Sequence, residues 1–251
     1  MKKLLLLLLL VPLFTFSQTN PDREYWQTNK WEAKTGMNSE FESGVAKKTD
    51  KFNGTAETSM VTYQITTGSD QGKYMRVMGN RDAAAFDEDN TAELAYWNKN
   101  VMPYVDNMDG NKIWWRMKGF SINWNNDLPP AKYVKMTTYT IKSGKWGDFS
   151  RFITNNVQLQ KELGYSGVRG WFMLENGGQE YQVLQVQPYN SHAEGLGKRS
   201  NPDLDYVDEY NKMHGWRTHR NDQAAFNASF EMWGRTVESA KLNTEMSSKL
   251  K

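Results

Sequence analysis

The chain of 251 residues contains no cysteine, and it has only three histidines and seven prolines. Without cysteine, disulfides and zinc sites with thiolate ligands are excluded, so the fold must rest on a hydrophobic core. The chain length and a hydrophobic content of 38% suffice for such a core, which excludes global disorder. Lys and Arg number 31 against 29 Asp and Glu, and this near balance argues against nucleic acid or a charged membrane surface as partner.

The one long apolar run lies at the start of the chain. Two lysines follow Met1, a leucine-rich stretch comes next, and small side chains stand at Thr15 and Ser17. This pattern predicts a secretory signal peptide over residues 1–17, cleaved before Gln18. A membrane anchor needs about 20 apolar residues, and this run is shorter. We therefore expect an exported protein, periplasmic or secreted, with no membrane span after removal of the signal.

Two stretches of the chain match each other at a constant spacing of 108 residues. Trp31 to Phe41 and Tyr139 to Phe149 share an aromatic residue, a lysine, a hydroxyl residue, a glycine, an acid and a phenylalanine at the same places. Each match leads into a helix-like segment, two strand-like runs joined by a glycine-containing loop, a second helical region and a closing strand. The first helix of the first copy is the weaker prediction, because Gly44 and Gly54 interrupt it.

The end of the second copy has two interpretations. Phe226, Phe230, Trp233 and Val237 have a spacing that continues one helix, whereas a match of Gly234 to Gly110 makes residues 236–246 a closing strand. We favour the strand because the repeat requires one.

Strand–helix–strand–strand–helix–strand is the order of a ferredoxin-like unit. Two such units in one chain resemble the dimeric alpha-beta barrel superfamily, and the tandem arrangement resembles a NIPSNAP-like protein. The resemblance implies an α+β fold in which two antiparallel ferredoxin-like sheets close an intrachain barrel with the helices outside. The predicted units are residues 18–124 and 125–251, the second with an insertion at about residues 190–221.

Aromatic residues and arginines share the predicted strands and are the candidates for a binding site. Trp114 and Trp115 are adjacent on one strand, so one must face the helices and the other the barrel interior. In one interpretation, the aromatic rings fill the core and the barrel, and the arginines lie at the barrel rim. In the other, the rings form the walls of a pocket for an apolar or planar ligand, with a polar group to hold it. The candidate ligand-binding residues are Tyr63, Arg76, Trp114, Trp115, Arg116, Tyr139, Trp171 and Tyr181.

The three histidines, His192, His214 and His219, are candidates for a haem ligand or an acid–base group. The sequence leaves the cofactor unknown; the resemblance makes haem one candidate, since several barrel relatives bind it through a histidine on a helix, but none of the three histidines matches such a motif. A spacing of five between His214 and His219 does not suit two ligands on one helical face. Surface histidines in a polar insertion are the plainer interpretation, and no metal, nucleophile or phosphate-loop motif is present.

Three functions remain open from the sequence. We favour an exported cell-envelope protein whose aromatic-lined barrel binds a small apolar or planar ligand. The alternatives are a small-molecule enzyme, such as a cofactor-free oxygenase or isomerase or a haem-dependent enzyme, and a structural or interaction protein without a pocket. No residue stands out as catalytic, and the enzyme alternative depends on the resemblance alone. An interior filled by the protein's own side chains would favour the structural alternative.

Overall fold

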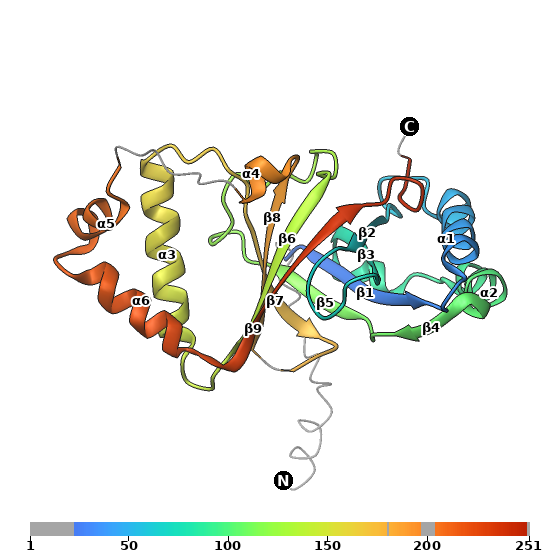
Figure 1. The fold of residues 1–251 in the computed structure, drawn as a ribbon, viewed down its shortest axis with the longest axis horizontal. Coiled ribbons are helices and arrows are strands. Elements are labelled where there is room, and N and C mark those ends of the chain that lie inside the picture. The colour runs from blue at the N-terminus through green and yellow to red at the C-terminus, as the bar shows by residue number, and fades with distance from the viewer. Residues whose placement is uncertain (1–22, 180, 197–203, 250–251) are drawn as a thin grey trace, which may run out of the picture.

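A computed structural model describes residues 23–179, 181–196 and 204–249, so the predicted signal peptide lies outside the described residues. Strands and helices are interspersed along the chain (Figure 1). The first half contains β1 (Tyr25–Ala33), α1 (Asn38–Phe52), β2 (Val61–Ile65), β3 (Tyr74–Arg81), the 3-10 helix η1 (Ala83–Asp87), α2 (Thr91–Asn100), η2 (Met102–Tyr104), β4 (Val105–Met108) and β5 (Lys112–Arg116). The second half contains β6 (Tyr133–Ile141), α3 (Trp146–Glu162), β7 (Gly170–Asn176), β8 (Gln182–Tyr189), α4 (His192–Leu196), α5 (Tyr206–His214), α6 (Thr218–Ala228) and β9 (Phe230–Leu242).

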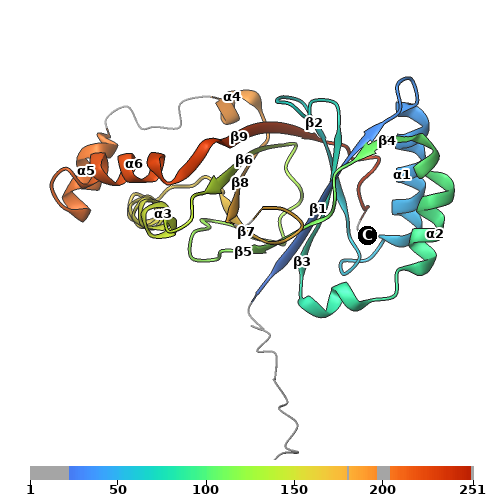
Figure 2. The ribbon, with the colours of Figure 1, turned by 90° about the horizontal axis from the view of Figure 1, so that it is seen from below.

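The strands close into an antiparallel barrel. Neighbours follow the order β3-β2-β9-β6-β8-β7-β5-β1, and β1 pairs with β3 to complete the ring. The remaining strand, β4, pairs with the end of β1. Helices α1 and α2 cover one side of the barrel, and α3, α5 and α6 lie on the other (Figure 2). The predicted α+β fold with an antiparallel barrel is therefore confirmed.

Each half contributes four barrel strands in the order of a ferredoxin-like sheet, β5-β1-β3-β2 in the first and β9-β6-β8-β7 in the second. Strands β1 and β6 begin at Tyr25 and Tyr133, and helices α1 and α3 begin at Asn38 and Trp146, 108 residues apart in both cases. The halves join through the pairs β2–β9 and β5–β7. Both edge strands of each half are thus paired with the edge strands of the other half.

Glycine 44 does not interrupt helix α1, which runs unbroken through it. A Cβ atom at Gly44 would lie 2.6 Å from the backbone oxygen of Asn100, at the end of α2. The missing side chain lets the two helices approach closely, and this gain outweighs the low helix propensity of glycine.

The C-terminal region forms a strand, as favoured from the sequence, and α6 ends before it at Ala228. Strand β9 begins earlier than predicted, at Phe230, because the strand continues on both sides of a bulge that contains Gly234. Tyr139 pairs with Arg235 and Ile141 with Phe230, so residues 231–234 lie outside the ladder. Within this bulge Trp233 has φ +63° and is 90% exposed.

Buried apolar side chains form three clusters. One fills the barrel interior with residues from both halves, including Tyr63, Met75 and Met136. A second lies between the first-half strands and α1 and α2, and the third between the second-half strands and α3 and α6. Within the part of the chain described here, no helix is long and apolar enough to cross a membrane.

Candidate functional site

The predicted ligand-binding residues do not converge on one site. Alternation along each strand sends neighbouring side chains to opposite faces of the barrel wall, and the candidates are divided accordingly. They lie in the interior (Tyr63, Trp114 and Arg116), in the helix-facing layer of the second half (Trp115, Tyr139 and Trp171), in that of the first half (Arg76) and on the surface (Tyr181).

Trp114 and Trp115 point to opposite faces, as their adjacency on one strand predicts. Trp114 lines the barrel interior, where its Nε1 donates a hydrogen bond to Thr28 Oγ1 at 2.9 Å. Trp115 packs against the apolar cluster beneath α3 and α6. The two indoles therefore lie in different parts of the structure, one in the barrel interior and one in the helix-facing layer.

Tyr139 and Trp171 are structural in the second half. Their ring centroids are 6.0 Å apart, and Phe149 of α3 lies 5.4 Å from Tyr139. All three side chains are buried, and burial raises the pKa of Tyr139. These rings form the contact between the sheet and α3, so they leave no surface for a ligand.

The prediction that Tyr181 lies on a strand is wrong. Strand β8 begins one residue later, at Gln182, and Tyr181 adopts φ +57° in the preceding turn. A non-glycine residue with this backbone conformation is uncommon in a regular strand and occurs there mainly at bulges. The side chain is 46% exposed.

The barrel interior holds a small cavity near the end where the β2–β3 and β7–β8 turns lie. Its volume is about 50 Å³, and Met75, Trp114 and Met136 are among its lining residues. Sites for drug-sized ligands measure about 300–1,000 Å³, so this cavity has room for a water molecule or two and not for a planar ligand. The interior is filled by the protein's own side chains.

An ion-pair network lies beside this cavity. Lys30 Nζ is 2.8 Å from Glu238 Oε2 and 2.5 Å from Asp70 Oδ2. Burial acts to lower the pKa of Lys30, but its bonds to Asp70 and Glu238 raise the pKa above its ordinary value. Lys30 therefore stays protonated at neutral pH.

The opposite end of the barrel is covered by residues 117–132, which connect the halves; we call it the linker end. Trp124 of this connection contacts Trp26 and Phe172 edge to face, with ring centroids 5.6 and 5.3 Å away. A Cβ atom at Gly170 would lie 2.5 Å from the Trp124 ring, so this glycine makes space for the indole. The three aromatic rings close the linker end.

A buried ion pair also lies at the linker end. Arg116 binds Glu24 through two nitrogens, with Nε 2.9 Å from Oε1 and Nη2 2.7 Å from Oε2. Trp26 Nε1 donates to the same carboxylate at 2.8 Å. Burial acts to raise the pKa of Glu24, but the hydrogen bonds from Arg116 and Trp26 hold it below its ordinary value. Arg116 is thus paired with Glu24 through Nε and Nη2.

Arg76 lies in the helix-facing layer of the first half. Its guanidinium is 5.2 Å from the centroid of the Trp97 ring, and Nη2 donates to Thr49 Oγ1 at 2.8 Å. A second buried cation, Lys48 of α1, shares this layer and forms an ion pair with Glu93 of α2. Two cations and one carboxylate therefore meet beneath α2.

The histidines do not fit a haem group. His192 is exposed and packs on the Tyr133 ring at 4.5 Å between centroids. His214 and His219 flank the buried Tyr210 ring at 4.7 and 5.0 Å, and burial lowers the pKa of His219. None of the three lines the interior cavity or the groove described next. Among the described residues, no three acidic or histidine side chains come together to hold a metal ion.

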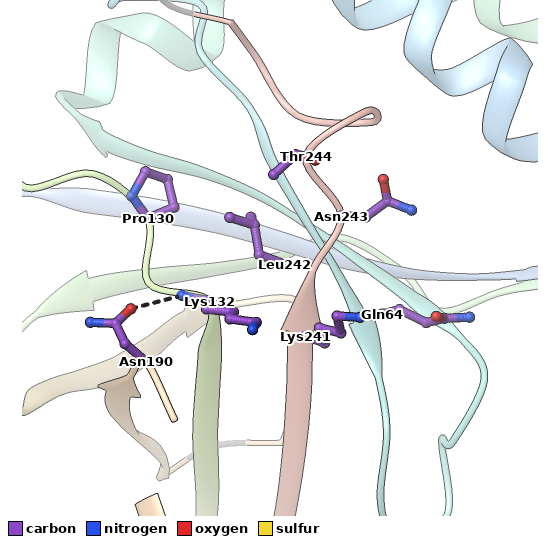
Figure 3. Close-up of a pocket in the computed structure, with 8 residues that line it drawn as sticks. All are labelled: Gln64, Pro130, Lys132, Asn190, Lys241, Leu242, Asn243 and Thr244. Atoms are coloured by element: carbon purple, nitrogen blue, oxygen red, sulfur yellow. Dashed lines mark hydrogen bonds between the residues drawn. The ribbon is translucent and has the colours of Figure 1, made fainter. Parts of the chain in front are cut away.

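An open groove of about 620 Å³ lies beside the linker end, where β6 begins and β9 ends (Figure 3). Two lysines line this groove. Lys132 directly precedes β6, and Lys241 lies on the neighbouring strand β9. The Lys132 backbone carbonyl accepts a hydrogen bond from the backbone N–H of Leu242 at 2.9 Å, which fixes the two strands side by side. The other polar groups of the lining are Gln64, Asn190, Asn243 and Thr244.

The groove carries positive charge without an acidic side chain in its lining. Across the described residues, neither Lys132 nor Lys241 has a carboxylate within ion-pair distance. Asn190 Oδ1 accepts from the backbone N–H of Lys132 at 3.2 Å, the bond drawn in Figure 3. Both lysine side chains are exposed and carry ammonium groups that can donate to an anion.

Comparisons with known proteins identify the fold. No protein-family model matches the chain, and no curated protein matches it in sequence. Its structure is similar to a protein of Lactobacillus acidophilus provisionally named a monooxygenase (TM-score 0.55, 11% identity, 92% of this chain and 100% of that one). It is also similar to a provisionally named monooxygenase of Fusobacterium nucleatum (0.54, 12%, 88% and 92%) and to a chlorite dismutase variant from Candidatus Nitrospira defluvii (0.52, 7%, 89% and 92%).

At these identities the likeness establishes the fold alone. The chain has the fold of the dimeric alpha-beta barrel superfamily, as its sequence resemblance implies. The narrower resemblance to a NIPSNAP-like protein stays a prediction.

Sequence reasoning missed the groove and the buried Lys48. The groove residues come from the ends of strands that are far apart in the sequence, and no local motif links them. Lys48 stands in a polar helix among Lys47 and Lys51, and only the packing of α2 over α1 distinguishes it.

Proposed function

We propose that this chain is exported and acts outside the cytoplasm as a binding protein for a small anionic ligand. The observation that carries this proposal is the groove beside the linker end, which has the volume of a ligand site and two lysines with no acidic side chain in its lining. Amide and hydroxyl groups around the lysines add donors and acceptors for a polar molecule such as a sugar acid.

This proposal moves the ligand from the barrel interior to the outside of the barrel. An apolar or planar ligand, which the aromatic residues suggested, has no room in a cavity of about 50 Å³. The packed interior favours a protein without an internal pocket, and the groove supports binding nonetheless.

The enzyme alternative is supported by the names of the similar structures, which include monooxygenases and chlorite dismutase. A cofactor-free oxygenase or isomerase needs a titratable group facing an enclosed substrate pocket. Lys30 and Glu238 face the small interior cavity, but they already neutralise each other. We therefore prefer binding.

We expect D-glucuronate or citrate to bind the wild-type chain and D-glucose to bind at least tenfold more weakly, as measured by isothermal titration calorimetry. Replacing Lys132 and Lys241 together with glutamine should weaken binding of the acid about tenfold or more, since a hydrogen bond to a charged group contributes about 1.5–3 kcal/mol. Lys118→Gln, at an exposed lysine outside the groove, is the matched control and should bind as the wild type does. Equal affinity of the double variant and the wild type would refute the proposal.

We expect export to remove residues 1–17. The chain recovered from the periplasm or medium of a bacterial host should have the intact mass of a protein that begins at Gln18. Ser17→Trp should block processing, because a small side chain is needed at this place, whereas Ser17→Ala should be processed normally. Recovery of the uncleaved chain from the cytoplasm would contradict export.

We also propose that residues 18–124 and 125–251 are tandem copies of one ferredoxin-like unit. The constant spacing of 108 residues and the shared strand order support this. The insertion predicted at about 190–221 would be an elaboration of the second copy; part of it, residues 197–203, lies outside the described residues.

A further inference from the structure

Three buried donors meet between α1, α2 and β3 in the first half. Arg76 of β3 and Lys48 of α1 are each 3% exposed, and Trp97 of α2 is 7% exposed. The Trp97 ring lies 5.2 Å from the Arg76 guanidinium and 5.9 Å from Lys48 Nζ, so both cations border the same indole. We call these three residues the cation cluster.

The charges of the cation cluster are not balanced. Glu93 is the one described carboxylate that pairs with it, and it binds Lys48. Arg76 has no carboxylate of its own, and its hydrogen bond goes to a neutral hydroxyl, Thr49 Oγ1. A buried ion without a counter-ion costs several kcal/mol, so proteins pair such groups or supply an anion. Burial lowers the pKa of Lys48 to about 8, and repulsion from Arg76 adds to this effect.

Hydrogen-bond donors of the cluster are also left without partners. Arg76 Nε and Trp97 Nε1 are buried and have no acceptor in the structure. More than nine in ten buried polar groups in proteins have a partner, so two such atoms in one cluster require an explanation. Lys48 donates two of its three ammonium hydrogens, one to Asn53 Oδ1 at 2.9 Å and one to Glu93, and one remains.

At the positions equivalent to Arg76 and Lys48, the second half of the barrel has neutral residues. Arg76 pairs across strands with Asn29, and the residue at the equivalent place is Gln185, paired with Thr137. The equivalent of Lys48, 108 residues on, is Asn156, which accepts a hydrogen bond from the Tyr206 hydroxyl at 2.7 Å. The fold therefore does not require cations at these positions.

We infer that the cation cluster is a binding site for one small inorganic anion of the halide class, held by Arg76 Nε, Trp97 Nε1 and Lys48 Nζ. The anion supplies the charge that Arg76 lacks and accepts the hydrogen bonds that both orphan donors can make. Because all three side chains are buried, we expect a monoatomic or similarly small ion. The site is separate from the groove and does not depend on the groove's proposed role.

The test is the thermal unfolding of the full chain in sodium chloride from zero to about 300 mM, at constant ionic strength maintained with sodium methanesulfonate, whose anion is larger than a halide and lacks the strong stabilising effect of sulfate. A ligand that binds only the folded state raises the melting temperature with its concentration, and we expect a rise of about 5 °C for the wild type. Trp97→Phe keeps an aromatic ring but removes one donor, so it should lose at least half of this rise. Trp171→Phe is the matched control, because Trp171 Nε1 is also buried without a partner but lies in the second half, outside the cation cluster.

Equal chloride responses in Trp97→Phe and the wild type would overturn the inference, as would no response in the wild type. The Lys132→Gln/Lys241→Gln variant should keep the full response, which separates this site from the groove. If Trp97→Phe does not fold, the chloride-35 line width decides: the folded wild type should broaden the line and the urea-unfolded chain should not. Absence of broadening would overturn the inference.

Discussion

Replacing Arg116 with methionine is expected to lower the free energy of unfolding by about 3 kcal/mol. The loss arises because Glu24, which is 8% exposed, would keep its charge in the barrel wall without the two nitrogens that now bind it. The Trp26 indole would remain as a donor to the carboxylate, but it carries no compensating charge. Urea unfolding at pH 7, followed by circular dichroism, measures the difference.

The double variant Glu24→Gln/Arg116→Met separates charge from packing. It removes both members of the pair, so it should be more stable than Arg116→Met alone. Lys212→Met provides an exposed control: Lys212 pairs with Asp208 and Glu209 on the surface of α5, and its loss should cost less than 1 kcal/mol. A double variant as unstable as Arg116→Met would show that Glu24 is not the cause.

The same pair sets a pH dependence. The pKa of Glu24 is lower in the folded chain than its ordinary value of 4.5. Its contribution to stability is therefore fully present above pH 4.5 and is lost as the pH falls through the folded-state pKa. This acid-dependent loss should be absent from the double variant.

The barrel could be predicted from the sequence because its signals are periodic. Each half repeats the same order of strands and helices at one spacing, and the matched Trp31 and Tyr139 lie at equivalent places on β1 and β6. The same logic selected the strand at the C-terminus over a continued helix. Each of these signals lies within a short segment of the chain, and the same signals occur again in the second half.

The position of the site could not be predicted, because it depends on which face of a strand each side chain occupies. Arg76 and Met75 are adjacent, yet the first joins the cation cluster and the second fills the barrel interior. A shift of one residue in register exchanges these faces, and the sequence does not fix it. Tyr181 shows the same difficulty at a strand end, where a left-handed turn residue removes it from β8.

The importance of Lys48 depends on tertiary packing alone. In the sequence it is one lysine of a polar helix, and its burial results from α2, whose Glu93 and Trp97 lie over it. The groove likewise exists only where the chain returns to the start of β6 at the end of β9. Neither feature has a signature within a single segment.

Expressing residues 18–124 and 125–251 as separate chains should leave neither of them folded and soluble. The interior cluster takes Tyr63 and Met75 from the first half and Met136 and Ala240 from the second, so each half alone exposes an apolar sheet face. Each half would also present two unpaired edges, because β2 pairs with β9 and β5 with β7 across the boundary. Exposed edges and apolar faces favour aggregation over folding.

Far-ultraviolet circular dichroism and a thermal melt of each fragment provide the measurement, and co-expression of the two should restore one cooperative transition. A protease site inserted between Leu128 and Pro129 is the control for the cut itself. Leu128 is exposed, so the nicked full-length chain should stay assembled and unfold in one step at a lower urea concentration than the intact chain. Two independent transitions, each reproduced by an isolated fragment, would show that the halves are separate domains and that the barrel contacts between them contribute little to stability.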